Sequence, residues 1–168
     1  MAGAVTLAPS MLKTTAARRL LFALTLPLCG SLVGCSSQPA PTLKVVGAEV
    51  TERTQDGLVV LFTVEAENAS GQEVPLRDVE YTVSLHGKPL FSGTRSAQAT
   101  VRRYGVQDFQ LPAAIPAAHA QQLSGMVPYT IEGTVTYVVP GVLAKAMFDM
   151  DVIRPETGFA GRGVVEVK

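Results

Sequence analysis

The sequence lacks the residue patterns that carry most enzyme chemistry. Its 168 residues contain no glycine-rich phosphate loop, no nucleophile elbow and no motif of paired cysteines. The two histidines, His86 and His119, are far apart in the sequence, and neither has a second His or Cys nearby. The ligand spacing of a metal site is therefore missing. We predict a protein that is not an enzyme, with no catalytic residues, no metal site and no cofactor.

An excess of positive charge is also missing, because 14 basic residues balance 14 acidic ones. Residues 1–34 hold three basic residues and no acidic one, which leaves 11 basic and 14 acidic residues in the remainder, a net charge of −3. A mildly acidic domain without a basic stripe argues against nucleic acid as a partner. One basic cluster is present, and it could bind phosphates or an anionic lipid surface, or simply keep the surface soluble: Arg95, Arg102 and Arg103, with Tyr104.

One pair of acidic residues is a weak candidate for catalysis. Asp149 and Asp151 are two positions apart, and on a strand they would share one face. A carboxylate pair of this kind could serve in general acid–base catalysis, but it has no partner motif. A solvated strand face is the favoured interpretation.

No apolar run reaches the roughly 20 residues that a membrane-spanning helix needs. The longest candidate, residues 20–29, follows Arg18 and Arg19 and has the length of the apolar region of a secretory signal. Residues 32–37 then read Leu-Val-Gly-Cys-Ser-Ser, which resembles the bacterial lipobox. In that family of signals, the Cys thiol receives a diacylglycerol and becomes the new N-terminus.

The resemblance implies a lipoprotein signal peptide at residues 1–34, a lipidated Cys35, a tether at residues 35–42 and a domain at residues 43–168. Cys29 would leave with the signal, so Cys35 would be the single Cys of the mature chain and no internal disulfide could form. Ser36 follows the Cys in place of Asp, which in such lipoproteins implies the outer membrane, with the domain facing the periplasm. An ordinary signal peptide with an incidental Cys, or a transmembrane anchor, would be the alternatives.

Residues 58–91 give the clearest secondary-structure signal. Leu58, Val60, Phe62, Val64 and Ala66 form one apolar row with a period of two, and Val79, Tyr81, Val83 and Leu85 form another. This alternation is typical of half-buried strands. The same pattern and the turn residues between the runs predict strands at residues 43–52, 58–66, 79–85, 89–94, 101–104 continuing into 106–111 past a bulge or break at Gly105, 129–138 and 144–152. A further short strand could follow at residues 164–167.

Turn residues punctuate these strands. We expect Asp56-Gly57 to close a hairpin and His86-Gly87 to form a tight turn. Asn68 and Gly71 should end a strand, because both tolerate positive φ and the Asn side chain can bond its own backbone. Residues 89–94 are predicted at a sheet edge, where a proline costs no hydrogen bond. Residues 115–123 could form two helical turns, and the glycine-rich segment 155–163 is predicted to be loose. About seven strands with one short helix predict a two-sheet antiparallel β-sandwich.

Three stretches together suggest a family. Residues 62–70 read Phe-Thr-Val-Glu-Ala-Glu-Asn-Ala-Ser, residues 74–87 begin Val-Pro-Leu and end in a Tyr-containing run at His86-Gly87, and residues 127–135 begin Val-Pro-Tyr. In this order they resemble the late embryogenesis abundant (LEA) type 2 family and its WHy domain (water stress and hypersensitive response). That family has Asn-Pro-Asn where this chain has Asn68-Ala69-Ser70.

The resemblance implies an immunoglobulin or fibronectin III-like sandwich, a non-enzymatic role and an association with desiccation and other stress. Combined with the lipobox, it predicts an envelope protein held to the membrane by its lipid, which protects or binds protein clients. The alternative is a structural accessory lipoprotein of an envelope assembly, which would hold its partner through an exposed sheet edge such as residues 89–94.

Overall fold

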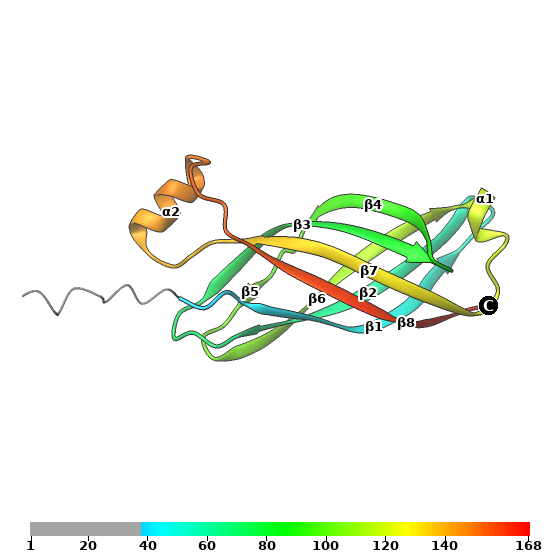
Figure 1. Ribbon diagram of the computed structural model, residues 1–168, viewed down its shortest axis with the longest axis horizontal. Helices are drawn as coiled ribbons and strands as arrows, with labels where there is room; N and C mark the ends of the chain where they lie inside the picture. The colour runs from blue at the N-terminus through cyan, green and yellow to red at the C-terminus, as the bar shows by residue number, and fades with distance from the viewer. Residues whose placement is uncertain (1–37) are drawn as a thin grey trace, which may run out of the picture. The chain divides into compact units, whose positions relative to one another are not determined.

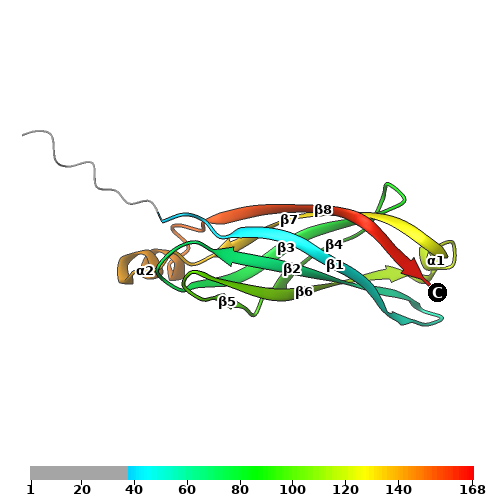
Figure 2. The same cartoon turned by 90° about the horizontal axis from the view of Figure 1, so that it is seen from below.

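The computed structural model describes residues 38–168, which fold into two antiparallel β-sheets packed face to face (Figures 1 and 2). The predicted signal segment, residues 1–34, and the predicted lipidation site Cys35 lie outside the described residues. The predicted all-β sandwich is confirmed, and the two helices among the described residues are short.

The smaller sheet has three strands in the order β1-β2-β6. They are β1 (Thr42–Arg53), β2 (Gly57–Asn68) and β6 (Gly105–Pro116). The central strand β2 is antiparallel to both neighbours. The inner row predicted for this strand is buried, with at most 1% of any side chain exposed: Leu58, Val60, Phe62, Val64 and Ala66. The period of two was therefore a reliable guide to the inward face.

The larger sheet has the order β4-β3-β7-β8, with the short β5 also paired to β3. Its strands are β3 (Val74–Leu85), β4 (Lys88–Ser96), β5 (Thr100–Val101), β7 (Gly125–Tyr137) and β8 (Glu156–Val167). Among the described strands β4 pairs only with β3, which confirms the predicted edge strand. The turn before β4 is also confirmed, because His86 and Gly87 both have positive φ, at 52° and 75°. That conformation matches a two-residue hairpin to the twist of its strands.

The inner faces of the two sheets share one hydrophobic core. Phe62 of β2 meets Tyr129 of β7 edge to face, with 5.2 Å between the ring centroids. Tyr81 of β3 reaches across to the other sheet and donates its hydroxyl to the carbonyl of Pro112 on β6 at 2.6 Å. Burial raises the pKa of Tyr81, and Arg95 lowers it less than burial raises it. The core is therefore tied across the sandwich by one polar contact as well as by apolar burial.

Strands β1 and β8 lie side by side where the two sheets meet along one edge (Figures 1 and 2). A Cβ atom on Gly161 of β8 would lie 2.5 Å from the Cβ of Val45 on β1, so only glycine allows this approach. Arg53 of β1 donates to the carbonyl of Lys168 at 2.7 Å. Thr157 of β8 donates its hydroxyl to the carbonyl of Pro41 at 3.1 Å.

The prediction that residues 155–163 are loose is wrong. Nearly all of this segment belongs to β8, and β8 pairs with β7 along its whole length. Its glycines make room for neighbours instead of adding mobility. Gly161 admits Val45, and a Cβ on Gly163 would lie 2.8 Å from the hydroxyl of Tyr129. The glycines of this segment therefore allow close packing between strands.

The predicted strand at residues 144–152 is also wrong. Residues Val142–Asp149 form helix α2. The segment is rich in Leu, Ala, Lys and Met, all of which favour helices, and Lys145 pairs with Asp149 one turn later at 2.6 Å. The apparent alternation of Ala144, Ala146 and Phe148 therefore did not mark a strand.

Two boundaries near Pro112 differ from the prediction. Strand β6 continues through Pro112 to Pro116, and only Ala117–Ala120 is helical, as α1. A proline fits here because β6 is the edge of its sheet and pairs only with β2 among the described strands. Of the strand predicted at residues 101–104, only Val101 is in a strand, the two-residue β5.

Candidate functional site

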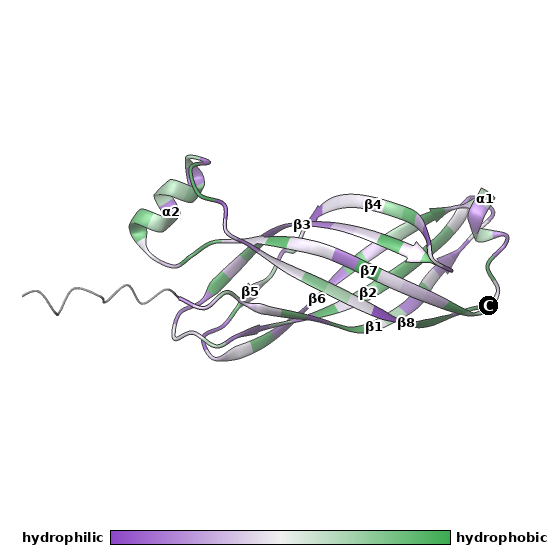
Figure 3. Ribbon diagram, viewed as in Figure 1, coloured by the Kyte–Doolittle hydropathy of each residue, from purple (hydrophilic) through white to green (hydrophobic). Residues whose placement is uncertain are grey.

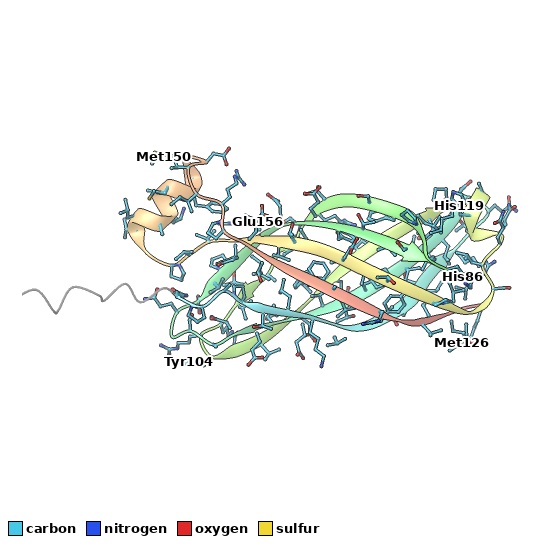
Figure 4. All side chains as sticks on the ribbon, in the orientation of Figure 1. His86, Tyr104, His119, Met126, Met150 and Glu156 are labelled. Atoms are coloured by element: carbon cyan, nitrogen blue, oxygen red, sulfur yellow. The ribbon has the colours of Figure 1, made fainter. Side chains whose placement is uncertain are left out.

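The two histidines lie at one end of the sandwich (Figure 4). His86 is exposed in the turn between β3 and β4, and His119 is in α1. The backbone N–H of His86 donates to the carbonyl of Pro128 at 3.0 Å, which is a structural role for its backbone. Within residues 38–168 no group of three or more His, Cys, Asp or Glu side chains is placed to hold a metal ion.

The two aspartates do not share a strand face. Asp149 ends α2 and pairs with Lys145, while Asp151 has a positive φ of 61° and pairs with Arg154. The guanidinium of Arg154 donates a hydrogen bond to the carboxylate of Asp151, and this bond raises the pKa of Arg154. Both aspartates are exposed, so the solvated interpretation fits the structure better than a catalytic pair.

The basic cluster is divided between separate elements. Arg95 is on β4, whereas Arg102, Arg103 and Tyr104 form the turn that leads from β5 into β6. Tyr104 is 76% exposed and has a positive φ of 48°. Its backbone N–H donates to the carbonyl of Ser70 at 3.0 Å, which fixes this turn against the one that follows β2.

Asn68 is a buried polar centre between those two turns, with 1% of its surface exposed. Its Oδ1 accepts the N–H of Ser70 at 2.9 Å, and its Nδ2 donates to the carbonyls of Gln72 at 2.7 Å and Arg102 at 3.1 Å. The predicted end of the strand at Asn68 and the bond from its side chain to the nearby backbone are confirmed, whereas the expected positive φ is wrong, because neither Asn68 nor Gly71 has it. A Cβ on Gly71 would instead lie 3.0 Å from the hydroxyl of Tyr104.

The α2 loop, residues 138–155 between β7 and β8, carries a concentration of exposed apolar side chains that the sequence interpretation missed. It was missed because residues 144–152 were predicted to be a strand, with Met150 and Val152 in its inner row. Figure 3 shows the hydrophobic residues along α2. The large apolar side chains exposed there are Val142 at 91%, Leu143 at 73%, Met150 at 66%, Val152 at 63% and Ile153 at 46%.

The base of the α2 loop is fixed to the sandwich. The N–H of Tyr137 donates to the carbonyl of Pro155 at 3.0 Å, and that of Val138 donates to the carbonyl of Pro75 at 2.9 Å. Phe148 is buried within the loop and lies under the guanidinium of Arg154, 5.3 Å from the ring centroid. Leu143, Met147 and Ile153 help to line an apolar groove of about 250 Å³ beside it.

The α2 loop projects from the end of the sandwich at which the described chain begins (Figures 1 and 2). Thr157, two residues after the loop, donates to the carbonyl of Pro41, one residue before β1. Figure 4 places Tyr104 at this end and both histidines at the other. Among the described residues, no helix has the length and apolar character needed to cross a bilayer.

Several solved structures are similar to this chain in fold. A protein from Arabidopsis thaliana, solved in solution, superposes with a TM-score of 0.58 at 14% identity and covers 77% of this chain and 83% of its own. A protein described as a candidate late embryogenesis abundant protein gives 0.59 at 17% identity over 77% and 72%. A protein from Archaeoglobus fulgidus gives 0.51 at 11% identity over 76% and 98%. At these identities the similarity shows the fold.

A search of curated protein sequences gave no match. The model of a protein family, described as late embryogenesis abundant protein, matches residues 63–152, more than half of the chain. The match begins within β2, includes β3 to β7, and ends just beyond α2. This chain therefore belongs to the late embryogenesis abundant type 2 family, as its sequence motifs suggested.

Proposed function

We propose that this chain is a lipid-anchored envelope protein whose LEA type 2 domain, of the WHy kind, protects or binds client proteins under water stress without catalysis. The observation that carries the proposal is the family match over residues 63–152, since this family is stress-related and non-enzymatic. The composition of the chain is apolar enough for a folded domain. In this it differs from the highly polar, disordered proteins that share the name late embryogenesis abundant.

The lipid anchor is the part of the proposal that rests on the signal sequence. Acyl chains contribute about 0.8 kcal/mol per buried CH₂ group, and stable anchoring needs more than one chain, which lipoprotein modification supplies. The choice between the two membranes rests on Ser36, which takes the place of the Asp that retains such lipoproteins in the inner membrane, so we place the protein at the outer membrane, facing the periplasm. The membrane is then its first partner, through Cys35.

The chain offers a matched pair of variants to test the anchor. Cys35→Ser should abolish acylation and release the protein from washed membranes, whereas Cys29→Ser, within the apolar run, should leave both unchanged. Mass spectrometry of the purified chain and fractionation after a high-salt wash give the two readouts. A Cys35→Ser protein that stays in the membrane after the wash would exclude the lipid as its anchor.

Protection is tested on a labile reporter enzyme that is dried or heated with the purified domain. We expect a larger surviving activity than with an unrelated β-sandwich at the same molar excess. Equal survival with the two sandwiches would contradict a protective role.

The free edge of β4 favours one alternative, a structural accessory that adds a partner strand to the larger sheet. A photo-crosslinker at Ser92 on β4 should then capture one partner in fixed stoichiometry, whereas one at Gln110 on β6 should not. Capture of no defined partner at Ser92 would exclude this alternative.

A further inference from the structure

We propose that the α2 loop is a membrane-contact element, which inserts its apolar side chains into the surface of the bilayer to which the chain is anchored. The inference rests on the proposed lipid anchor and extends it from the position of one residue to the orientation of the whole domain. The surface that covers the loop is then lipid, and a loop covered by a second copy of the chain or by a protein partner would contradict the proposal.

The exposed apolar surface is concentrated on this one loop. In the part of the chain that the structure describes, ten large apolar side chains are exposed, and five of them lie in the α2 loop. The loop base is held by backbone hydrogen bonds to the sandwich, so these side chains are presented by a fixed element. A gathering of exposed apolar residues is typical of an interaction surface.

The charges of the loop fit a lipid surface better than a charged protein partner. Its two basic and two acidic residues form two ion pairs, Lys145 with Asp149 and Arg154 with Asp151. The loop therefore carries no net charge and has little electrostatic complementarity to offer a charged surface. A short helix with an apolar outer face and long basic side chains at its margin can lie in the interfacial region of a bilayer.

The position of the loop identifies the bilayer as its occupant. Six peptide units separate Cys35 from Pro41, and an extended chain spans at most about 3.3–3.6 Å per residue, so Pro41 can lie no more than roughly 20 Å from an acylated Cys35. Pro41 is itself hydrogen-bonded to Thr157, directly after the α2 loop. A lipid on Cys35 would therefore hold this end of the sandwich close to the membrane.

The turn between β5 and β6 adds a second feature at the same end. It carries Arg102, Arg103 and the exposed Tyr104, and Figure 4 shows Tyr104 at the same end as Met150. Aromatic side chains of this kind prefer the membrane–water interface, and basic residues are attracted to anionic headgroups. The acidic surplus of the domain does not oppose the contact, because these two features face the bilayer.

The test uses the processed, full-length lipoprotein, and two methionines serve as a matched pair. Met150 in the loop is 66% exposed and Met126, at the opposite end, is 69% exposed. With Cys29 removed and Cys35 acylated, Met150→Cys and Met126→Cys each supply one reactive thiol for an environment-sensitive fluorophore. The labelled proteins are reconstituted into vesicles of phosphatidylethanolamine and phosphatidylglycerol, with and without brominated phosphatidylcholine.

We expect the probe at position 150 to be blue-shifted and quenched by brominated lipid, at a depth of about 5–10 Å below the headgroups. The probe at position 126 should report water and escape quenching. Adding Leu143→Asp and Val152→Asp to the Met150→Cys chain should abolish the blue shift and the quenching, so that its probe reports water as the probe at position 126 does. The mass of each purified chain reports the anchor separately.

Three results would overturn the inference. Acylated chains with equal, water-like emission at both positions would leave the anchor standing and remove the contact. A blue shift at position 150 without quenching by lipid would mean that protein, such as a second copy, covers the loop. Absence of acyl chains on Cys35 would remove the anchor and this inference with it.

Discussion

Asn68 is the residue whose replacement should test the structure most directly. Its side chain joins the turn from β2 to β3 and the turn from β5 to β6, and each of these turns leads from one sheet to the other. The N–H of Ser70, a residue 8% exposed, has Asn68 Oδ1 as its acceptor. In Asn68→Ala this buried donor loses its partner, which costs about 1–3 kcal/mol.

The carbonyl partners lose less. Gln72 O also accepts the hydroxyl of Ser70 at 3.0 Å, and Arg102 O also accepts the N–H of Gly105 at 3.2 Å. Each keeps one hydrogen bond in the variant, so losing the second contributes only about 0.5 kcal/mol. We therefore expect Asn68→Ala to lower the free energy of unfolding by about 2–4 kcal/mol, as the sum of these effects.

Asn68→Asp should be worse at neutral pH and should recover in acid. The new carboxylate keeps an acceptor for Ser70 but turns an oxygen toward carbonyls, and an uncompensated buried charge costs about 3–5 kcal/mol. Its pKa in the folded state is raised above the ordinary value of about 3.9. The folded state then binds more protons than the unfolded state, so stability is retained below about pH 4 and is lost as the pH rises through the folded pKa.

Urea unfolding followed by far-UV circular dichroism measures both effects, since the chain has no tryptophan. Gln72→Ala is the matched control, because its side chain is exposed in the same turn and its carbonyl is retained. Loss of less than about 0.5 kcal/mol in Asn68→Ala, the range of ordinary surface substitutions, would refute the assigned role. So would Asn68→Asp with a stability that does not depend on pH.

Three further substitutions test the packing of the two sheets, each by the same unfolding measurement. Tyr81→Phe removes the hydroxyl bond to Pro112 and should cost about 1 kcal/mol. Because burial raises the pKa of Tyr81, ionisation disfavours the folded state, so the parent should lose stability as the pH rises above about 10 and the variant should lose less. An unchanged alkaline profile would contradict this. Phe62→Ala removes a fully buried ring and its contact with Tyr129 and should cost about 3–5 kcal/mol, and a loss below 1 kcal/mol would disprove its central place in the core. Gly161→Ala forces a Cβ against Val45 and should cost about 1–3 kcal/mol, whereas Gly158→Ala, whose Cβ would meet nothing closer than 3.8 Å, should be tolerated, so equal effects would argue against the tight β1–β8 approach.

The sequence was informative wherever the structure follows from neighbouring residues. The alternation over residues 58–66 identified the inner row of β2, and His86-Gly87 identified the turn into β4. The edge position of β4 followed from Pro89, because a proline there loses no ladder hydrogen bond. The motifs over residues 62–87 and 127–135 identified the family that the match over residues 63–152 shows.

The sequence was least informative about the α2 loop, and therefore about the surface proposed to meet the membrane. Ala144, Ala146 and Phe148 fit a period of two as well as a short helix, and eight residues are too few for periodicity to decide between them. The exposure of Met150 and Val152 could not be anticipated either, because both were placed in the inner row of a predicted strand and so assigned to the core.

The sequence by itself determined the alternating strands, the hairpin turns and the family, because these depend on the order of adjacent residues and on the φ angles they allow. The tertiary structure alone decided that Gly161 faces Val45, that Asn68 binds the carbonyl of Arg102, and that Pro41 meets Thr157 beside the α2 loop. Each of these contacts joins residues far apart in the chain. Which distant residues meet is set by how the two sheets pack, and no local pattern encodes that packing.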